Sequence, residues 1–444
     1  MKISKPLPTI DLMNKFEPEQ LFPCLPDYKA VDEKGRYLHW HDFQFRNPQN
    51  SELKWLAVKL NRASLKNTIK LGDEIFSFCV PDSLQSQLHF VDKATGGNVG
   101  TTSLSGLSKA EQDRFLLKSL IMEEAITSAQ LEGAVTTRKV AKEMLETERK
   151  PKTKDEIMIV NNYKLMTEAI KLKDQPLSLD LILEFHRLAT NNAIENNAAP
   201  GEFRTDNEIY IADNDGNKIH QPPAYEKLSQ LMEDLCQFAN EEHNGEEGAL
   251  FIHPVIKAII LHFLIGYIHP FGDGNGRTAR ALFYWFMLKS GYWLFEYISI
   301  SRLLKVAPVK YAKAYIYTET DELDMTYFIY YQMDIIKRAI NALETYITNK
   351  QSHFKKFMGE IAKFTAKSSV KINDRQMRIL QKAVKNTGYI FTAKEICNEY
   401  GVTENTARKD LKTLHDLNLL GVFKVGKSTG YISPSDLLER LQRS

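Results

Sequence analysis

Residues 269–280 read HPFGDGNGRTAR, and this stretch decides how the middle of the chain folds. The segment before it, 254–268, is apolar on nearly all sides, which predicts a buried helix. That helix is expected to end at His269, because Pro270 cannot continue it. The segment after the stretch, 277–290, is predicted to be another helix. The stretch therefore joins two helices of a mainly α-helical core.

The glycine-rich loop in this stretch has the features of a phosphate site. Glycines at 272, 274 and 276 allow backbone N–H groups to converge without obstruction by Cβ atoms. The N-terminus of the following helix adds about half a positive charge. Arg277 and Arg280 lie close together on the first turn of that helix. Two guanidinium groups are more than one carboxylate needs, so the pattern favours a polyphosphate.

Two further residues supply what phosphate transfer requires. Asp273 lies inside the positive loop, where its carboxylate is expected to hold a magnesium ion against phosphate oxygens. His269 is the titratable base next to them, and a neutral imidazole can take the proton of an attacking hydroxyl. The alternative is a glycine-rich helix cap with surface arginines, but the combined residue types favour a site.

Two common nucleotide-binding motifs are excluded. No Gly-Lys-Ser/Thr follows the loop, so it is not a Walker A sequence. A helix rather than a strand is predicted before it, so it is not a Rossmann fingerprint.

HPFGDGNGRTAR resembles the signature of Fic-domain proteins, HPFx(D/E)GNGRxxR, at every fixed position. The resemblance covers roughly residues 100–340. It implies an all-helical Fic core that transfers AMP from ATP to a Ser, Thr or Tyr hydroxyl of a protein, with Mg²⁺. It implies that His269 is the general base and Asp273 the metal ligand. The implied phosphate-binding residues are Gly274, Asn275 and Gly276 at the α-phosphate, Arg277 along the phosphate chain and Arg280 at the γ-phosphate.

A helix is predicted over about 108–133, upstream of the signature. Ser108 followed by Glu111 is a capping-box pattern that opens the helix, and Gly133 fits its C-cap. Ser128 and Glu132 then lie one turn apart on the same face. The structural alternative for this end of the helix is an ordinary amphipathic helix with a solvated glutamate.

The end of this helix, TSAQLEGA at 127–134, resembles the inhibitory motif [S/T]xxxE[G/N] of Fic proteins. Ser128, Glu132 and Gly133 occupy the fixed positions of that motif. The resemblance implies that Glu132 pairs with Arg280 and that ATP then enters in a non-productive pose. The protein is accordingly expected to be autoinhibited.

The segment 208–223, EIYIADNDGNKIHQPP, interrupts the helical pattern. It alternates apolar and polar residues on both sides of NDGN, which predicts a β-hairpin projecting from the helical body. The hairpin resembles the Fic flap, which implies that a target segment adds a strand at Ile209, Tyr210 and Ile211. Gly201 and Arg204 resemble the family pattern GxxR.

The last part of the chain, 370–444, is predicted to be a winged helix-turn-helix domain. It has three helices and a short hairpin, and it carries thirteen Lys and Arg against eight Asp and Glu. In the predicted recognition helix, NTARKDLKTL, Arg408, Lys409 and Lys412 can meet DNA phosphates. Because Glu404, Asp410 and Asp416 dilute that face, DNA binding and protein docking are both kept open.

The remaining segments complete the division of the chain into 1–100, a core of 101–365 and the tail. Residues 1–100 are expected to be a Fic-associated segment, with a helix near 50–69. His39 and His41 alternate with aromatic residues, which favours one face of a strand or a packing surface over a metal site. Further helices are predicted over 138–148, 154–173, 179–193, 224–242 and 302–318.

Composition points to the cytoplasm. The four cysteines lie far apart, with no CxxC pair, and are expected to be reduced. The first twenty residues have no continuous apolar region of a signal peptide, and 255–268 is too short for a membrane span.

Several functions remain open from the sequence. Besides AMP transfer, the site is compatible with UMP or phosphocholine transfer, or with removal of AMP by a water positioned by Glu132. A third alternative is a nucleotide-sensing regulator that binds DNA through the tail. The expected partners are a protein substrate, the chain itself through self-modification, and a second copy in a homodimer.

Overall fold

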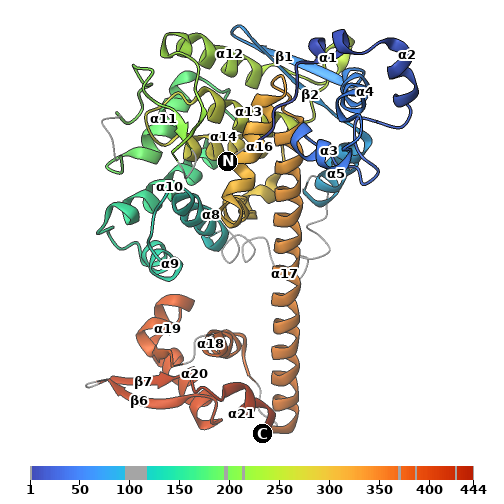
Figure 1. Cartoon of the computed structure of the whole chain (residues 1–444). Helices are drawn as coiled ribbons and strands as arrows, with labels where there is room; N and C mark the ends of the chain where they lie inside the picture. The colour runs from blue at the N-terminus through green and yellow to red at the C-terminus, as the bar shows by residue number, and fades with distance from the viewer. Residues whose placement is uncertain are drawn as a thin grey trace. The chain divides into compact units, whose positions relative to one another are not determined.

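The computed structural model describes residues 3–95, 118–194, 199–212, 216–368, 372–385, 388–425 and 428–443. The chain divides into two compact units, Met1–Glu344 and Thr345–Ser444, which are treated separately below. The fold is mainly helical, with small β-hairpins and a C-terminal HTH domain (Figure 1). Within the described residues, no helix is both long enough and apolar enough to cross a membrane.

The N-terminal elements of the first unit combine short helices with one hairpin. The strands β1 and β2 pair antiparallel around Gly72 and Asp73. The elements are α1 (Thr9–Lys15), α2 (Pro18–Leu21), η1 (Phe22–Cys24), α3 (Trp40–Arg46), α4 (Ser51–Ala63), β1 (Lys66–Leu71), β2 (Glu74–Cys79) and α5 (Asp82–Thr95).

Two expectations for this region are corrected. The aromatic stretch with His39 and His41 begins helix α3 and is not a strand, because His39 caps the helix by accepting a hydrogen bond from the His41 backbone N–H. The helix expected near 50–69 ends at Ala63, and strand β1 follows. His39 stacks on Tyr317 with ring centroids 4.0 Å apart, which agrees with the packing surface that the sequence favoured as an alternative.

The helical core follows the predicted periodicity closely. The predicted inhibitory helix is described from Lys118 onward, and residues 108–117 lie outside the described residues. The elements are α8 (Lys118–Leu131), α9 (Arg138–Thr147), α10 (Lys154–Lys171), α11 (Leu179–Thr190), η3 (Tyr225–Lys227), α12 (Leu228–Asn240), η4 (Glu246–Gly248), α13 (Pro254–Ile268), α14 (Asn275–Lys289) and η5 (Trp293–Tyr297).

Helices α13 and α14 form the centre of the first unit. Almost every residue of both helices is buried, including Phe263, Trp285 and Ile268. A helix that is apolar on all sides is stable only when other elements surround it, and α10, α11 and α12 pack around this pair. The loop between α13 and α14 is thus held at both ends by the best-packed part of the unit.

The predicted helix 302–318 is two helices, α15 (Ser301–Val306) and α16 (Pro308–Thr320). The break lies at Ala307, because Pro308 cannot donate a backbone hydrogen bond and disfavours helical geometry in the residue before it. A long helix, α17 (Thr326–Ser368), follows and runs past the boundary of the first unit.

The predicted flap is a short antiparallel hairpin in the described residues. Strand β3 (Ile211–Ala212) pairs with β4 (Lys218–His220), and Ile211 lies opposite His220. Ile209 and Tyr210 precede the strand rather than belonging to it. The predicted turn at NDGN falls partly on residues 213–215, which lie outside the described residues.

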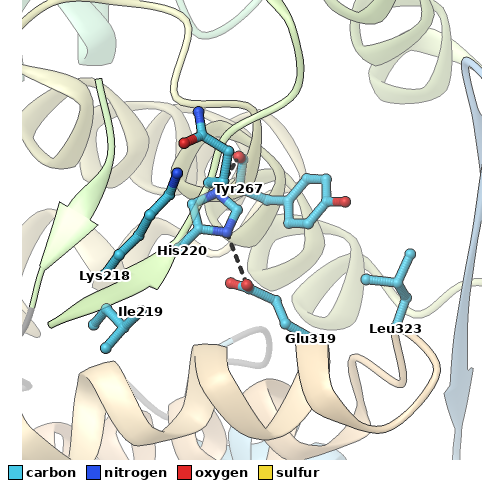
Figure 2. Close-up of a pocket in the computed structure, with 7 residues that line it drawn as sticks. Lys218, Ile219, His220, Tyr267, Glu319 and Leu323 are labelled. Atoms are coloured by element: carbon cyan, nitrogen blue, oxygen red, sulfur yellow. Dashed lines mark hydrogen bonds and ion pairs between the residues drawn. The ribbon is translucent and has the colours of Figure 1, made fainter. Parts of the chain in front are cut away.

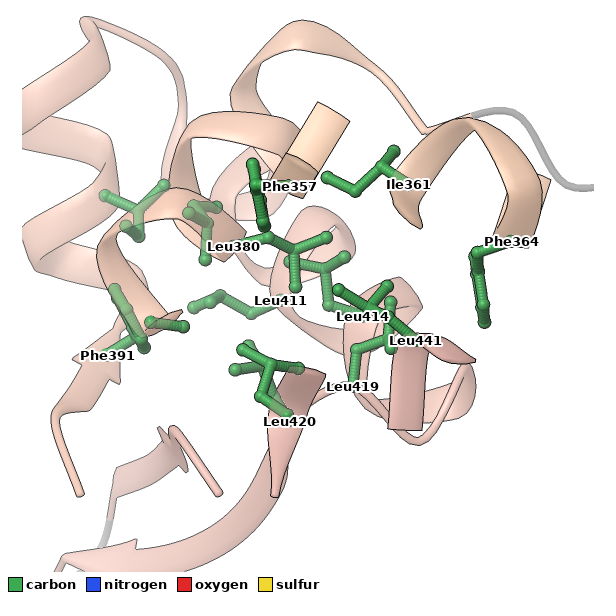
Figure 3. Packing of buried hydrophobic residues seen from close by; sticks show 14 of the residues in the cluster. Phe357, Ile361, Phe364, Leu380, Phe391, Leu411, Leu414, Leu419, Leu420 and Leu441 are labelled. Carbon is green, nitrogen blue, oxygen red and sulfur yellow. The ribbon is translucent and has the colours of Figure 1, made fainter. Parts of the chain in front are cut away.

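The C-terminal unit has its own hydrophobic core (Figure 3). Its strands have the order β5–β7–β6 and are all antiparallel. Phe357, Ile361 and Phe364 of α17 pack in this core, and the unit begins at Thr345, earlier than residue 370. Its elements are α18 (Asp374–Lys385), β5 (Ile390–Thr392), α19 (Ala393–Tyr400), α20 (Glu404–Asp416), β6 (Gly421–Val425), β7 (Ser428–Ile432) and α21 (Leu437–Arg443).

Candidate functional site

His269 lies at the C-cap of α13 in a left-handed backbone conformation, with φ of 49°. Its Nδ1 is 3.3 Å from the carbonyl oxygen of Gly266. Because a carbonyl can only accept, Nδ1 carries the hydrogen and the lone pair is on Nε2. Burial lowers the pKa of His269 to about 4, so the imidazole is neutral at pH 7. A neutral ring with a free lone pair is the form that a general base needs.

Arg204 holds this histidine in place. Its Nε donates to the carbonyl oxygen of His269 at 3.0 Å, and its backbone N–H donates to the carbonyl of Pro270 at 2.9 Å. A second nitrogen, Nη1, donates to the carbonyl of Asp206 at 2.7 Å. A left-handed residue with a side chain is unfavourable by itself, so such contacts are needed to fix it. The GxxR pattern therefore marks a structural clamp on the candidate base.

The loop after His269 is braced by its own polar groups. The Asn275 amide donates to the carbonyl of Phe271 at 2.8 Å and accepts from its N–H at 3.0 Å. Gly274 adopts φ of 82° as the N-cap of α14, a conformation that favours glycine. The Asn275 side chain is already hydrogen-bonded to the Phe271 backbone. We therefore expect the backbone N–H of Asn275, at the start of the helix, to make the phosphate contact.

His186 of α11 supports the same loop and was not anticipated. Its Nδ1 accepts from the Gly201 N–H at 3.0 Å, and its Nε2 donates to the carbonyl oxygen of Asp273 at 2.8 Å. The ring stacks on Phe271 with centroids 3.7 Å apart. Burial lowers the pKa of His186 to about 4, which suits this neutral, two-contact arrangement. A lone histidine in an amphipathic helix gives no signal in the sequence that predicts this contact.

Arg277 is fully buried and anchored locally. Its Nη1 donates to the carbonyl of Ala189 at 2.7 Å, and its Nη2 donates to Oδ1 of Asp273 at 3.1 Å. Its Nε has no hydrogen-bond partner among the described residues. A buried guanidinium with an unsatisfied N–H is expected to attract an anionic ligand.

Arg280, one turn further along α14, is held by helix α8. Its Nε donates to Oγ of Ser128 at 2.9 Å, and its Nη2 donates to the Ser128 carbonyl at 3.2 Å and to Oε1 of Glu132 at 3.0 Å. Nη1 of Arg280 has no hydrogen-bond partner among the described residues. The two residues predicted from the sequence therefore do converge on Arg280.

The Glu132 carboxylate also lies directly against Gly276. A Cβ atom built on Gly276 would come within 2.3 Å of Oε1 of Glu132, so any larger residue there would have to displace the carboxylate. Gly133 follows with φ of 102°, which ends helix α8 as the C-cap pattern predicts. The glutamate thus reaches the first turn of α14 from the end of α8.

Helix α8 is fixed by a second carboxylate, Glu124, two turns before Glu132. The Ser301 backbone N–H and the Ser299 hydroxyl donate to its Oε2 at 3.2 and 2.8 Å. The Ser301 hydroxyl donates to its other oxygen. Burial raises the pKa of Glu124. These contacts attach α8 to the start of α15, independently of Arg280.

Asp273, the expected metal ligand, lies in the loop between α13 and α14. Oδ1 of Asp273 accepts from the Gly274 N–H at 2.5 Å and from Arg277. Its side chain remains 27% exposed, so the carboxylate is accessible. No group of three or more His, Cys, Asp or Glu among the described residues is arranged to hold a metal by itself. A single carboxylate fits Mg²⁺ that takes its other ligands from phosphate and water.

The C-terminal unit has a basic helix face. On α20, Asn405, Arg408, Lys409 and Lys412 are exposed. Asp410, which was expected to dilute this face, is 4% exposed and points inward, where it binds Arg375 at 2.8 Å. The expectation is therefore corrected, and Glu404 and Asp416 are the acidic residues left exposed on α20.

Comparison with known proteins agrees with this arrangement. The sequence pattern of the Fic/DOC family matches residues 176–287, and that of an HTH domain matches residues 375–442. The chain is 36% identical over 118 residues to protein adenylyltransferase Fic of Drosophila virilis, covering 26% of this chain and 21% of the relative. It is 29% identical over 197 residues to the Drosophila persimilis protein of the same name, covering 43% and 34%.

The chain therefore spans about a fifth to a third of the length of these two relatives. Among solved structures, a Fic family protein from Desulfovibrio desulfuricans G20 matches with a TM-score of 0.50 and 16% identity. That match covers 79% of this chain and 96% of the other, and it supports the fold alone. Together with the geometry of the loop, these matches identify a Fic/DOC family domain followed by a C-terminal HTH domain.

Proposed function

We propose that this protein is an autoinhibited protein adenylyltransferase that transfers AMP from ATP to a Ser, Thr or Tyr hydroxyl. The observation that carries the proposal is the neutral His269 ring, with its lone pair on Nε2, at the start of the loop that leads into α14 and its two buried arginines. The name of the Drosophila relatives, protein adenylyltransferase, favours AMP as the transferred group.

The proposed step is an in-line displacement at the α-phosphorus of ATP. The target hydroxyl oxygen forms the new bond to phosphorus, His269 Nε2 takes its proton, and pyrophosphate leaves with the electron pair of the broken bond. The N–H groups of Asn275 and Gly276 hold the α-phosphate, and the Gly274 N–H joins them when it releases Oδ1 of Asp273, while Arg277 and Arg280 hold the β- and γ-phosphates. Asp273 would hold Mg²⁺, which would supply positive charge against the phosphate oxygens.

Autoinhibition follows from the position of Glu132. An arginine paired with a carboxylate at 3.0 Å cannot give the same Nη2 to the γ-phosphate. The carboxylate also occupies the space over Gly276 that phosphate oxygens would use. ATP bound in this state has its α-phosphorus out of line for attack, and lost alignment alone can slow a displacement by about a hundredfold or more.

The flap is the proposed docking edge for the target. A target segment adds a strand beside Ile211 of β3 and the two residues before it, Ile209 and Tyr210, because backbone N–H and C=O groups at a strand edge can pair with an extended peptide. Tyr210 is 53% exposed, so its side chain is available for that contact. A loop of the same chain or of a second copy can occupy the edge, which makes self-modification the expected basal reaction.

The decisive experiment compares Glu132→Gly with the parent in an assay with labelled ATP. The variant frees Arg280 and should raise AMP incorporation about a hundredfold or more. Glu123→Gln is the matched control, because Glu123 lies on α8 but pairs with Arg138 instead. The control should leave the rate unchanged, and adding His269→Ala to Glu132→Gly should lower incorporation to the parent level or below.

The proposal fails if Glu132→Gly, folded by circular dichroism, incorporates no more label than the parent. Mass spectrometry distinguishes the alternative reactions within the same fold. A mass increase of UMP or phosphocholine on the modified protein would indicate another transferred group. Loss of AMP from a previously modified protein would indicate the reverse reaction, with a water positioned by Glu132.

A second candidate function is DNA binding by the HTH domain. The burial of Asp410 favours it, because the exposed face of α20 then carries Arg408, Lys409 and Lys412. If this helix contacts DNA phosphates, affinity should fall steeply with added salt as counterions are released. The variant with Lys409→Glu and Lys412→Glu should bind less DNA, while Lys394→Glu on α19 serves as the control. Salt-independent or undetectable binding would leave protein docking as the role.

A further inference from the structure

The base of the flap is fixed by one buried histidine. His220 of β4 is 7% exposed, and its Nε2 lies 2.8 Å from the carbonyl oxygen of Tyr267. Its Nδ1 lies 2.8 Å from Oε2 of Glu319 on α16 (Figure 2). Because the carbonyl can only accept, Nε2 carries a hydrogen, and the contact with Glu319 needs one further proton between the two groups. One side chain thus ties β4 to both α13 and α16.

The turn that follows Glu319 has an unfavourable backbone. Glu322 and Leu323 are consecutive residues with φ of 56° and 53°, although both carry side chains. Left-handed residues other than glycine persist only where the surrounding structure holds them. The turn therefore needs external contacts to keep its shape.

Those contacts come from the N-terminal region. Strand β2 pairs with the turn, since the Ser77 N–H donates to the Leu323 carbonyl at 3.1 Å and the Met325 N–H donates to the Ser77 carbonyl at 2.8 Å. Three side-chain contacts join Lys59 to Asp321 at 2.9 Å, Thr9 to Glu322 at 2.9 Å and Tyr37 to Asp324 at 2.6 Å.

The turn and the flap also share a cavity of about 240 Å³. It is lined by β4, the end of α13, α16 and the turn, and Figure 2 shows the Glu319 carboxylate beneath His220 with Leu323 beside it. Glu319 lies two residues before Asp321, which Lys59 holds. A shift of the turn therefore moves Glu319, and with it the anchor of β4.

We propose that Glu319 is a positioning residue for modification of the target, and that the N-terminal region sets its position through the turn. The inference rests on the proposed function, because the flap is where a target strand docks. It gives the N-terminal region a role within the reaction: it holds the docking edge beside His269.

The first test is hydrogen–deuterium exchange of the β4 amides in the full chain without nucleotide. Glu319→Ala should make these amides exchange about tenfold faster, because an anchoring hydrogen bond is lost. Glu319→Gln should behave as the parent, since its amide N–H can donate to Nδ1 of a neutral imidazole. Unchanged exchange in Glu319→Ala overturns the proposal, and so does equally fast exchange in both variants.

The second test reaches the flap from the N-terminal side. Tyr37→Phe removes the hydroxyl that donates to Asp324 and should also speed exchange in β4. Tyr330→Phe is the matched control, because its hydroxyl contacts Ser83 at 2.6 Å and not the turn. If both variants have the same effect on β4, the proposed link from the N-terminal region is wrong.

The third test distinguishes an effect on target docking from an effect on ATP binding. The enzyme is the Glu132→Gly chain, and the acceptor is a second copy carrying His269→Ala. Glu319→Ala in the enzyme should raise the KM for the acceptor several-fold and leave the KM for ATP unchanged. If β4 loosens without any change in acceptor KM, Glu319 does not position the target. Absence of transfer in every variant would defeat the proposed function, while the exchange experiments still decide the flap anchor.

Discussion

Arg277 and Arg280 both lie on α14, but different contacts hold them on two sides of the helix. On the loop side, Arg277 is anchored by Asp273 of the loop itself and by the carbonyl of Ala189 on α11. On the α8 side, Arg280 is anchored by Ser128 and Glu132, which lie about 150 residues earlier in the chain. The contacts of Arg277 help to form the phosphate site, and we infer that the contacts of Arg280 inhibit it. Chemistry and its control are therefore separable by mutation.

The largest effect is expected on the loop side, from His269→Ala in the Glu132→Gly background. Loss of the general base should lower AMP transfer by about 10²–10⁴-fold, while ATP binding persists because the backbone cradle and both arginines remain. Calorimetric titration with ATP measures the binding. Parallel loss of binding and transfer would contradict this division of roles.

Asp273→Ala, in the same background, should have the next largest effect. It removes the expected magnesium ligand and also one partner of Arg277. We expect about a hundredfold lower transfer and a rate that no longer depends on magnesium. The measurement is the initial rate over a magnesium titration. A rate that still rises with magnesium concentration would require another ligand.

Ser128→Ala should relieve the proposed inhibition by α8 only partly. It removes one hydrogen bond to the Arg280 guanidinium but leaves Glu132 in place. Because a hydrogen bond to a charged group contributes about 1.5–3 kcal/mol, transfer should rise about tenfold over the parent. Labelled-ATP incorporation gives the comparison with Glu132→Gly. A rise as large as that of Glu132→Gly would mean that serine, not glutamate, holds the inhibited state.

The smallest effect is expected from pH. Burial lowers the pKa of His269 to about 4, so the base stays neutral above that pH and becomes protonated only below it. Transfer by the Glu132→Gly chain should therefore change less than about twofold between pH 8 and 6 on account of His269. The pH profile of kcat/KM tests this. A decline centred near the ordinary histidine pKa of about 6.5 would show that the ring is less buried during the reaction.

Local patterns predicted much of the fold. The helices around the signature were predicted from their periodicity, and the winged tail from its order of helices and hairpin. The β1–β2 hairpin was missed although Gly72 and Asp73 stand between alternating apolar residues, which is a recognised two-residue hairpin signal. The break at Ala307 could also have been predicted from Pro308. Both the β1–β2 hairpin and the break at Ala307 are therefore determined by neighbouring residues in the sequence.

Contacts between distant segments could not be predicted in the same way. His186 of α11, Glu124 of α8 and Glu319 of α16 are single residues whose partners lie far away along the chain. Asp410 was expected on the exposed face of α20 but turns inward to Arg375. Periodicity places a residue on a face of its helix, but only packing decides what that face meets.

The sequence by itself determined the chemistry offered by residues 269–280. Proline, glycine and the helix start act within a few residues, so the order of the letters already brings His269, Asp273 and the arginines together. Only the tertiary structure decided that Glu132 meets Arg280 and that the N-terminal region holds the turn before α17. These pairings depend on how helices pack, and packing is a property of the whole core that no short segment contains.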